Sequence, residues 1–470
     1  MKRLLVACVL LALPLAAVAH DGPHFDAKRL AEEVKALSSD AFEGRGPATA
    51  GETKTIDYVV AKLKEAGASP GGDLKDGKRL WTQAVPLLRS SIKGTPSLSI
   101  AIDGKPMALT QGEQISVRAA MDGSKQVKLD KVPLVFVGYG VNAPERNWND
   151  YADVDMKGKI AIALINDPDF ETGTGDFGGK AMTYYGRWTY KFEEAARQGA
   201  AGLLVVHETA PASYGWATVK NSNTNTMFDV VREDARSVHP QVEAWIQRDL
   251  AVDLFKQAGL DFDALKKQAQ QRGFKAVALK NESFSADYAV DAEVITSQNI
   301  VGRIEGSKYP DETVIYSAHW DHLGMGQADA EGDTIYNGAV DNATGTAALI
   351  EMARAYAHAP KPQRSVVFLA VTAEEKGLLG SEYYASKPLY PLATTVAVIN
   401  TDALDPTGVA RNFTTSGSAK SDLLDALIAI GKANGMAYVT DPHPEAGHFF
   451  RSDHFGFAKR GVPALSYGSG

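Results

Sequence analysis

The chain has 470 residues, of which 44% are hydrophobic and 23% charged, and its formal net charge is −8. This length exceeds one ordinary domain and predicts two or three, with cores large enough to fold without disulfides or structural metals. The negative charge and the lack of a basic run argue against nucleic acid as a partner.

Residues 1–19 have the pattern of a secretory signal peptide. Lys2 and Arg3 precede an apolar stretch, and the small residues Ala-Val-Ala at 17–19 form a cleavage site. Removing this segment takes the net charge to −10 and removes Cys8, the single cysteine. No later stretch resembles a membrane-spanning helix. We therefore expect a mature protein that is secreted or periplasmic, leaves the membrane after cleavage, and has no thiolate metal site or disulfide.

Residues 20–125 are predicted to form the N-terminal part of the main domain. Apolar residues spaced three and four apart predict two helices within residues 27–66, separated by the glycine-rich loop DAFEGRGPATAG and ending at Gly67. Short alternating runs between residues 80 and 118 predict strands joined by glycine turns.

Residues 126–285 are predicted to form a smaller inserted domain with connecting helices. PLVFVGYGV, KGKIAIALIN and AGLLVVHE are typical of strands, whereas KFEEAARQGA, VEAWIQRDLAVDLFKQAG and DFDALKKQAQQRG favour helices. The run GTGDFG has the glycine spacing of a dinucleotide-binding loop. Eight residues separate it from the preceding strand and no helix follows it, so we do not expect a dinucleotide there.

Residues 286–470 alternate between strand and helix patterns. ETVIYSAH, RSVVFLAV, TTVAVINTD and VPALSYG predict strands, and helices are expected at 344–358, at about 378–386 and in SDLLDALIAIGKANG. This alternation predicts an α/β fold whose mixed, mostly parallel sheet is flanked by helices.

One histidine and several acids follow successive strands of this last domain. They are His319, Asp321, Asp341, Glu374, Glu375 and Asp402. Because such a sheet gathers side chains at the carboxyl ends of its strands, we expect these residues to meet. Oxygen-rich ligands with few histidines suit two metal ions about 3.5–4 Å apart that share a carboxylate and activate a water. A nearby glutamate would take the water's proton, which predicts metal-assisted hydrolysis of an amide.

Each residue also has a simpler interpretation. Asp341 directly precedes a helix and could be its N-cap. Glu374 and Glu375 could be solvated acids in a surface loop, although neighbouring acids at a buried strand end repel each other unless a cation lies beside them. A charge at Asp402 is costly unless it is paired or exposed. The signatures of single-zinc endopeptidases and of α/β-hydrolases do not occur.

The runs HWDHLG, NGAVDNATG, AEEKGLLGS and NTDALD resemble the two-zinc exopeptidases that include bacterial leucyl aminopeptidases and glutamate carboxypeptidases. DAFEGRGPATAG and WTQAVPL are similar to that family's N-terminal part, and residues 131–215 resemble its inserted protease-associated (PA) domain. The resemblance implies the zinc exopeptidase fold, a peptide substrate and two zinc ions as cofactors. It further implies the roles of six residues: His319 and Asp402 bind one zinc, Glu375 binds the other, Asp341 bridges both, Glu374 is the general base, and Asp321 orients His319.

The sequence departs from the family near its end. The family's last ligand is a histidine in a Tyr-His-Thr-like motif, some tens of residues after a segment resembling SDHFGFAKRGVPALSYGSG. Because the sequence stops at Gly470, we expect residues 286–470 to lack the C-terminal end of the peptidase domain. His454 matches a position that is usually not a ligand. It is a candidate pocket residue, or else a structural or surface histidine.

The leading hypothesis is a secreted zinc aminopeptidase that acts on the N-termini of peptides. A carboxypeptidase of the same scaffold is an alternative and would need basic residues for the substrate carboxylate, for which Arg187 and Arg451 are candidates. A catalytically inactive binding protein is another alternative. The absence of the family's last zinc-binding histidine favours it, and the presence of Glu374 opposes it. The preference for particular side chains in the peptide substrate and the oligomeric state of the protein do not follow from the sequence.

Overall fold

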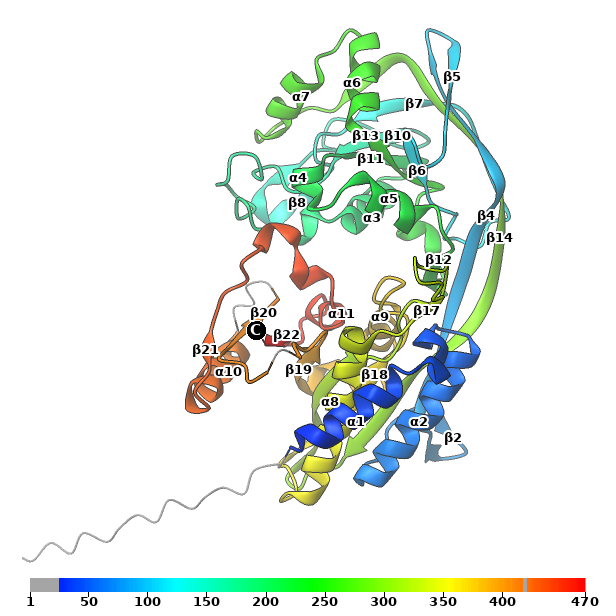
Figure 1. The fold of residues 1–470 in the computed structure, drawn as a ribbon. Coiled ribbons are helices and arrows are strands. Elements are labelled where there is room, and N and C mark those ends of the chain that lie inside the picture. Colours follow the sequence, from blue (N-terminus) through cyan, green and yellow to red (C-terminus); the bar gives the residue numbers. More distant parts are fainter. Residues whose placement is uncertain (1–24, 407, 417–420, 470) are drawn as a thin grey trace, which may run out of the picture.

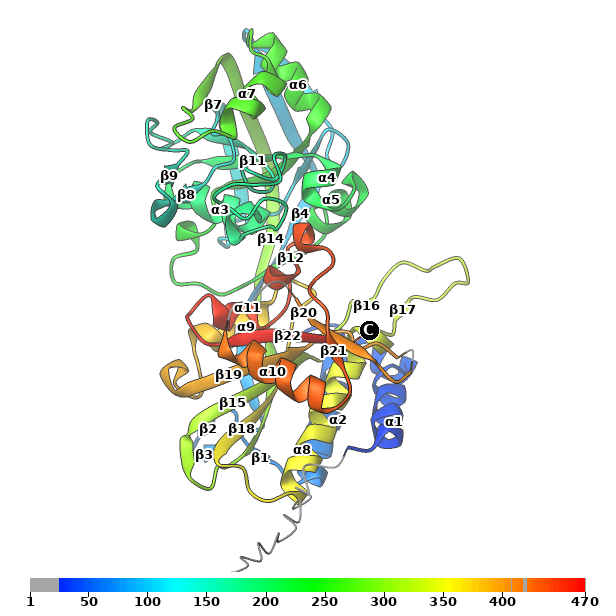
Figure 2. The same ribbon diagram turned by 90° about the vertical axis from the view of Figure 1, so that its left-hand side faces the viewer.

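The computed structural model describes residues 25–406, 408–416 and 421–469, so the predicted signal peptide and Cys8 lie outside the described residues. The chain forms two lobes stacked end to end, and both views show them joined by a pair of long strands (Figures 1 and 2). These strands are β4 (Thr82–Ile102) and β14 (Val277–Ile304), which pair in antiparallel fashion. We call residues 25–81 and 300–469 the α/β lobe and residues 103–276 the insert lobe.

The sheet of the α/β lobe has the strand order β21-β20-β22-β19-β15-β18-β14. Its central strands are mutually parallel, whereas β14 runs antiparallel to β18 and β20 runs antiparallel to β22. Parallel strands are buried on both faces, which explains their nearly continuous apolar sequences. The strands are β15 (Tyr309–His319), β18 (Arg364–Val371), β19 (Thr395–Thr401), β20 (Asn412–Thr415), β21 (Ala437–Tyr438) and β22 (Ala464–Ser469).

Helices cover both faces of this sheet, which confirms the predicted fold class. On β18, Val366 and Phe368 pack with α1, α2 and α8, whereas Val367 and Leu369 pack on the other face with α9 and α11. The predicted end of α2 is confirmed at Gly67, whose φ of 94° suits glycine. The helices are α1 (Ala27–Leu37), α2 (Ala50–Ala66), α8 (Thr344–His358), α9 (Leu379–Ser386), α10 (Asp422–Ala433) and α11 (Phe455–Ala458).

The insert lobe has its own small α/β layer around β7-β10-β11-β13, all parallel, with β6 antiparallel at the edge. The strands are β6 (Ile115–Val117), β7 (Gln126–Phe136), β10 (Ile160–Leu164), β11 (Gly202–His207) and β13 (Val242–Gln247). The helices are α3 (Trp188–Arg197), α4 (Thr209–Ala212), α5 (Trp216–Asn223), α6 (Arg248–Gln257) and α7 (Phe262–Ala269).

Short strands complete the fold. They are β1 (Ser69–Pro70), β2 (Leu74–Lys75), β3 (Lys78–Arg79), β5 (Lys105–Leu109), β8 (Asn142–Ala143), β9 (Trp148–Asn149), β12 (Met227–Val230), β16 (Gly324–Met325) and β17 (Ile335–Tyr336). Figure 2 shows the β16–β17 hairpin standing out from the α/β lobe.

Two predicted elements differ from the structure. VEAWIQ, predicted to begin a helix, is the buried strand β13, because an apolar run of this length fits both a helix and a parallel strand. The region from residue 82 to 102, predicted as short strands with glycine turns, is the single strand β4, which passes through Gly94. The predicted boundary at 285/286 lies inside β14, so a continuous strand joins the lobes at this point.

The lobes also meet through the segment that precedes α11, which rises toward the insert lobe (Figure 1). Met182 N donates a hydrogen bond of 3.0 Å to Pro444 O. The Tyr184 ring lies 5.0 Å from that of Phe455, measured between centroids, and Lys459 Nζ is 3.3 Å from Glu193 Oε1. No helix within the described residues is long and apolar enough to span a membrane.

A buried ionic network ties β12 to β13 and gives a pH-dependent stability. His239 Nε2 lies 2.8 Å from Asp229 Oδ2, and its Nδ1 lies 2.6 Å from Glu243 Oε1. Burial opposes the charge, but the Glu243 and Asp229 carboxylates raise the pKa of His239 to about 9. This stabilisation is complete below the unfolded pKa near 6.5 and is lost as pH rises through 9. We expect about 3 kcal/mol to disappear over that range.

Urea unfolding at pH 6 and pH 9.5 measures this loss, with His239→Gln as the control that cannot titrate. The wild-type protein should lose more stability than the variant between the two pH values. An equal loss in both proteins would contradict the role of His239.

Candidate metal centre

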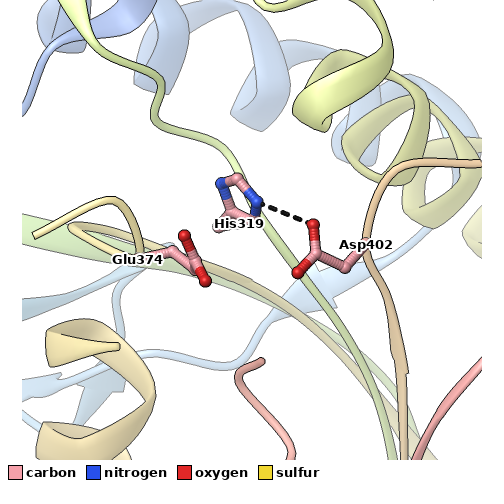
Figure 3. Close-up of side chains that lie close together, drawn as sticks. All are labelled: His319, Glu374 and Asp402. Carbon is pink, nitrogen blue, oxygen red and sulfur yellow. Dashed lines mark hydrogen bonds and ion pairs between the residues drawn. The ribbon is translucent and has the colours of Figure 1, made fainter. Parts of the chain in front are cut away.

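The six predicted site residues lie together at the carboxyl ends of β15, β18 and β19. His319 is the last residue of β15, and Asp402 directly follows β19. Glu374 follows β18 after a tight turn in which Ala373 has a φ of 54°. Figure 3 shows the side chains of these three segments, His319, Glu374 and Asp402, approaching one another. The sheet therefore brings together residues up to 83 positions apart in the sequence.

A first ligand cluster consists of His319, Glu374 and Asp402, each with a ligand atom within 4.8 Å of the others. His319 is 1% exposed, and its Nε2 lies 3.1 Å from Asp402 Oδ1 and 3.0 Å from Asp341 Oδ1. Its Nδ1 lies 3.0 Å from the backbone oxygen of Asp321. A carbonyl can only accept, so Nδ1 carries a proton, and Nε2 is the ring nitrogen directed at the carboxylates where a metal ligand is needed.

Asp321 supports this cluster in a different way from the one predicted. Its carboxylate lies 3.8 Å from His319 Nδ1, farther than its own backbone oxygen, and accepts a hydrogen bond of 3.1 Å from Glu374 N. Asp321 therefore joins the end of β15 to the turn after β18. Burial, together with the negative charge of Glu375, raises the pKa of Asp321 to about 6.

A second ligand cluster consists of His322, Asp341 and Glu375. His322 Nδ1 lies 2.6 Å from Glu375 Oε1. Asp341 is half-exposed and lies between the clusters, because its Oδ1 also approaches His319. The N-cap interpretation of Asp341 is wrong, since Asn342 Oδ1 accepts the hydrogen bond from Gly345 N at the start of α8. Sequence reasoning missed His322, although it directly follows Asp321 in HWDHLG.

The unpaired atoms of the site fit divalent metal ions. Four buried atoms lack a hydrogen-bond partner of acceptable geometry among the described residues: Asp321 Oδ2, His322 Nδ1, Asp341 Oδ1 and Glu375 Oε1. The His322 and Glu375 atoms are close to each other without forming a hydrogen bond, as expected for atoms directed at a common point. Buried polar atoms are rarely left unpaired, and carboxylate with imidazole is a usual donor set for zinc and similar metals.

Arg45, from the predicted glycine-rich loop, supports the second cluster from behind. It is 1% exposed, and its guanidinium donates to the backbone oxygens of four residues. The acceptors are Leu37 at 2.7 Å, Trp320 at 2.9 Å, Asn337 at 2.6 Å and Gly338 at 2.8 Å. Its own backbone oxygen accepts from His322 N at 3.3 Å. Arg45 thus connects the segment before His322 to the segment before Asp341. No pattern in the sequence reveals this role of Arg45.

The segment around His454 lies behind the first cluster. Ser452 Oγ donates a hydrogen bond of 3.0 Å to Asp402 Oδ2, and Ser381 Oγ donates one of 2.6 Å to Asp453 Oδ1. His454 is completely buried, neither ring nitrogen has a partner among the described residues, and its ring packs edge-on against Phe449. Burial lowers the pKa of His454 to about 3, so the ring is neutral. The structure places His454 in the interior, outside both ligand clusters of the described residues.

Two arginines from different lobes lie near each other. Arg187 belongs to the insert lobe, and Arg451 directly precedes Ser452. Burial and the charge of Arg451 together lower the pKa of Arg187 to about 10. Neither arginine forms an ion pair with a carboxylate of the described residues. Two neighbouring cations without a carboxylate partner among the described residues are suited to bind an anion.

The residues of both clusters lie in a segment that is similar to known metallopeptidases. Residues 299–469 match the sequence model of peptidase family M28. A probable zinc metalloprotease of Pyrenophora tritici-repentis is 38% identical over 103 residues, which cover 22% of this chain and 23% of that protein. Aminopeptidase NAALADL1 of Mus musculus is 38% identical over 116 residues, covering 23% of this chain and 14% of its own length. The chain thus spans less than a quarter of the length of these curated relatives.

The fold is shared with a solved structure over nearly the whole chain. An aminopeptidase from Aneurinibacillus sp. strain AM-1 superposes with a TM-score of 0.52 at 19% identity, covering 95% of this chain and 85% of that one. The predicted zinc exopeptidase fold is therefore confirmed, whereas the likeness of residues 131–215 to a PA domain stays a prediction. The segment that matches the model of peptidase family M28, residues 299–469, contains both ligand clusters.

Proposed function

We propose that the protein is a secreted, zinc-dependent aminopeptidase that removes N-terminal residues from peptides. The observation that carries this proposal is the pair of histidine and carboxylate clusters at the carboxyl ends of β15, β18 and β19. The names of the relatives, a zinc metalloprotease and aminopeptidases, support it. Secretion rests on the signal peptide predicted for residues 1–19.

Two zinc ions fit the two clusters. His319 and Asp402 would hold one, His322 and Glu375 the other, and Asp341, which lies between the clusters, would contact both. Bound zinc supplies a Lewis acid that polarises the scissile carbonyl and lowers the pKa of a water.

Glu374 acts as the general base of this proposal. Its carboxylate accepts the proton of the attacking water and passes it to the leaving amine. The Glu374 N to Asp321 Oδ1 hydrogen bond fixes the turn that carries the carboxylate. Asp321 is thus a positioning residue: its backbone oxygen orients His319, and its side chain orients the segment of Glu374.

A carboxypeptidase is the second candidate because of Arg187 and Arg451. These cations have no carboxylate partner among the described residues, and Arg451 directly precedes the serine that contacts Asp402. Such a pair could bind the free C-terminal carboxylate of a peptide, whereas an aminopeptidase must recognise a free N-terminus.

Two blocked substrates distinguish these candidates. We expect the zinc-loaded protein to hydrolyse leucyl-4-nitroanilide, which has a free amine and no carboxylate. It should leave an N-acetylated peptide with a free C-terminus intact. A chelator should abolish the activity, zinc should restore it, and elemental analysis should find two zinc ions per chain. The reverse substrate pattern would establish the carboxypeptidase, and hydrolysis of neither substrate would exclude both.

A further inference from the structure

A cavity of about 560 Å³ lies in the insert lobe, away from the metal centre. Much of its wall is apolar and comes from β7 and β14, with Leu134, Val135, Ala278 and Leu279 among the lining residues. None of the predicted catalytic or metal-binding residues lines it. A concave, mostly apolar site with a few polar groups is the usual form of a small-molecule site.

The cavity lies beside an irregularity in the sheet. Ala278 on β14 pairs with Val135 on β7, but the next paired residue of β14, Ser283, already faces Pro133. Residues 279–282 therefore leave the ladder with β7, and Asn281 adopts a φ of 65°. Bulges of this kind redirect side chains and are common beside functional sites.

Glu282 places a carboxylate in this cavity. It pairs with Ile102 of β4 and begins the row of alternating buried residues Glu282, Phe284, Ala286 and Tyr288, so its side chain is on the core face of β14. It is only 4% exposed, and neither carboxylate oxygen has a hydrogen-bond partner among the described residues. Leaving such a group unpaired is costly, so this carboxylate is suited to pair with a group that enters the cavity.

The other charged groups around the cavity do not supply that partner. Lys159 and Lys280 line the cavity, but neither forms an ion pair with Glu282, and Lys159 Nζ donates to the backbone oxygen of Asp155 at 2.5 Å. Asp153, also in the lining, accepts from Ala276 N at 3.3 Å. Burial and the negative charge of Asp103 raise the pKa of Glu282 to about 7. A cation beside Glu282 would offset both the cost of burying the carboxylate and its repulsion by Asp103.

We propose that this cavity binds an organic ammonium ion that carries an apolar chain, with the Glu282 carboxylate as its counter-ion. The ammonium donates hydrogen bonds to both unpaired oxygens, and the chain covers the walls formed by Leu134 and Leu279. A bare metal ion does not suit the cavity, because the carboxylates of Glu282 and Asp153 in a largely apolar wall cannot replace the six to eight oxygens that calcium requires. The proposal is independent of the peptidase function of the other lobe.

Calorimetry with n-hexylamine tests this proposal on the whole protein. At pH 8 we expect hexylammonium to bind, and n-hexanol, hexanoate and ammonium chloride to bind at least about tenfold more weakly, because each lacks either the charge or the apolar chain. Nα-acetyl-lysinamide, used in the same titration, distinguishes a lysine side chain of a peptide from a free alkylamine as the natural ligand. Binding of hexylammonium should weaken as pH falls through 7, where Glu282 becomes protonated.

Glu282→Gln is the decisive variant and Glu233→Gln its control, since Glu233 is an exposed acid of the same lobe. Glu282→Gln should reduce hexylammonium affinity at least about tenfold, whereas Glu233→Gln should bind as the wild type does. Hydrolysis of leucyl-4-nitroanilide should be equal in all three proteins. Unchanged affinity in Glu282→Gln, or binding that hexanol matches, would overturn the proposal. If Glu282→Gln does not fold, the pH series on the wild-type protein tests the proposal instead. Hexylammonium affinity that does not fall below pH 7 would then overturn it.

Discussion

Replacing Glu374 with glutamine should reduce peptide hydrolysis by about 10²–10⁴-fold while zinc remains bound. Glutamine keeps the size of the side chain but cannot accept the proton of the attacking water. The loss should appear in kcat, because the substrate contacts and the ligands His319 and Asp402 are unchanged. The measurements are kcat and KM for leucyl-4-nitroanilide, together with zinc per chain by elemental analysis.

The neighbouring residue provides a matched control. Glu375→Gln makes the same chemical change one position later, but Glu375 belongs to the second cluster, where its Oε1 lies 2.6 Å from His322 Nδ1. We expect this variant to lose zinc as well as activity. If Glu374→Gln also loses zinc, Glu374 is a ligand of the first cluster, because its carboxylate is within ligand distance of His319 and Asp402. A wild-type rate in Glu374→Gln would remove it from catalysis.

The sequence was most informative where a residue's role depends on its position along one strand. His319, Asp402 and the Glu374–Glu375 pair all follow apolar runs, and the carboxyl ends of parallel strands meet at one edge of the sheet. Their gathering was therefore predictable before any contact was known. The helices with polar caps or glycine ends, such as α2 with Gly67, were predictable for an equally local reason.

The parts that could not be predicted depend on contacts between distant segments. VEAWIQ forms a strand because β11 pairs with it, and its apolar run alone fits a helix equally well. His322 faces Glu375, 53 positions later, only because of the path that the chain takes after β15. Gly94 lies inside β4 because the paired strand β14 continues past it.

The role of Arg45 depends most strongly on contacts between distant segments. Replacing Arg45 with methionine should lower the free energy of unfolding by at least about 3 kcal/mol. The four backbone oxygens that its guanidinium binds would lose a charged donor in a buried place, where water cannot replace it. Burial lowers the pKa of Arg45 to about 10, against the attraction of Asp321 and Asp341, so the side chain is still charged at neutral pH. Its charge also offsets part of the repulsion among the acids of the site.

The same substitution should weaken zinc binding in the second cluster more than in the first. Arg45 binds the oxygens of Asn337 and Gly338, just before Asp341, and its backbone accepts from His322 N. Arg45→Lys should fall between the wild type and Arg45→Met, because an ammonium cannot reach four divergent oxygens. Arg364→Met is the control, since Arg364 is exposed and paired with Glu312, and should cost no more than about 1 kcal/mol. Urea unfolding of the metal-free proteins and zinc titration separate the two effects. Equal stability of Arg45→Met and Arg364→Met would mean that the backbone around the second cluster holds its shape without the guanidinium.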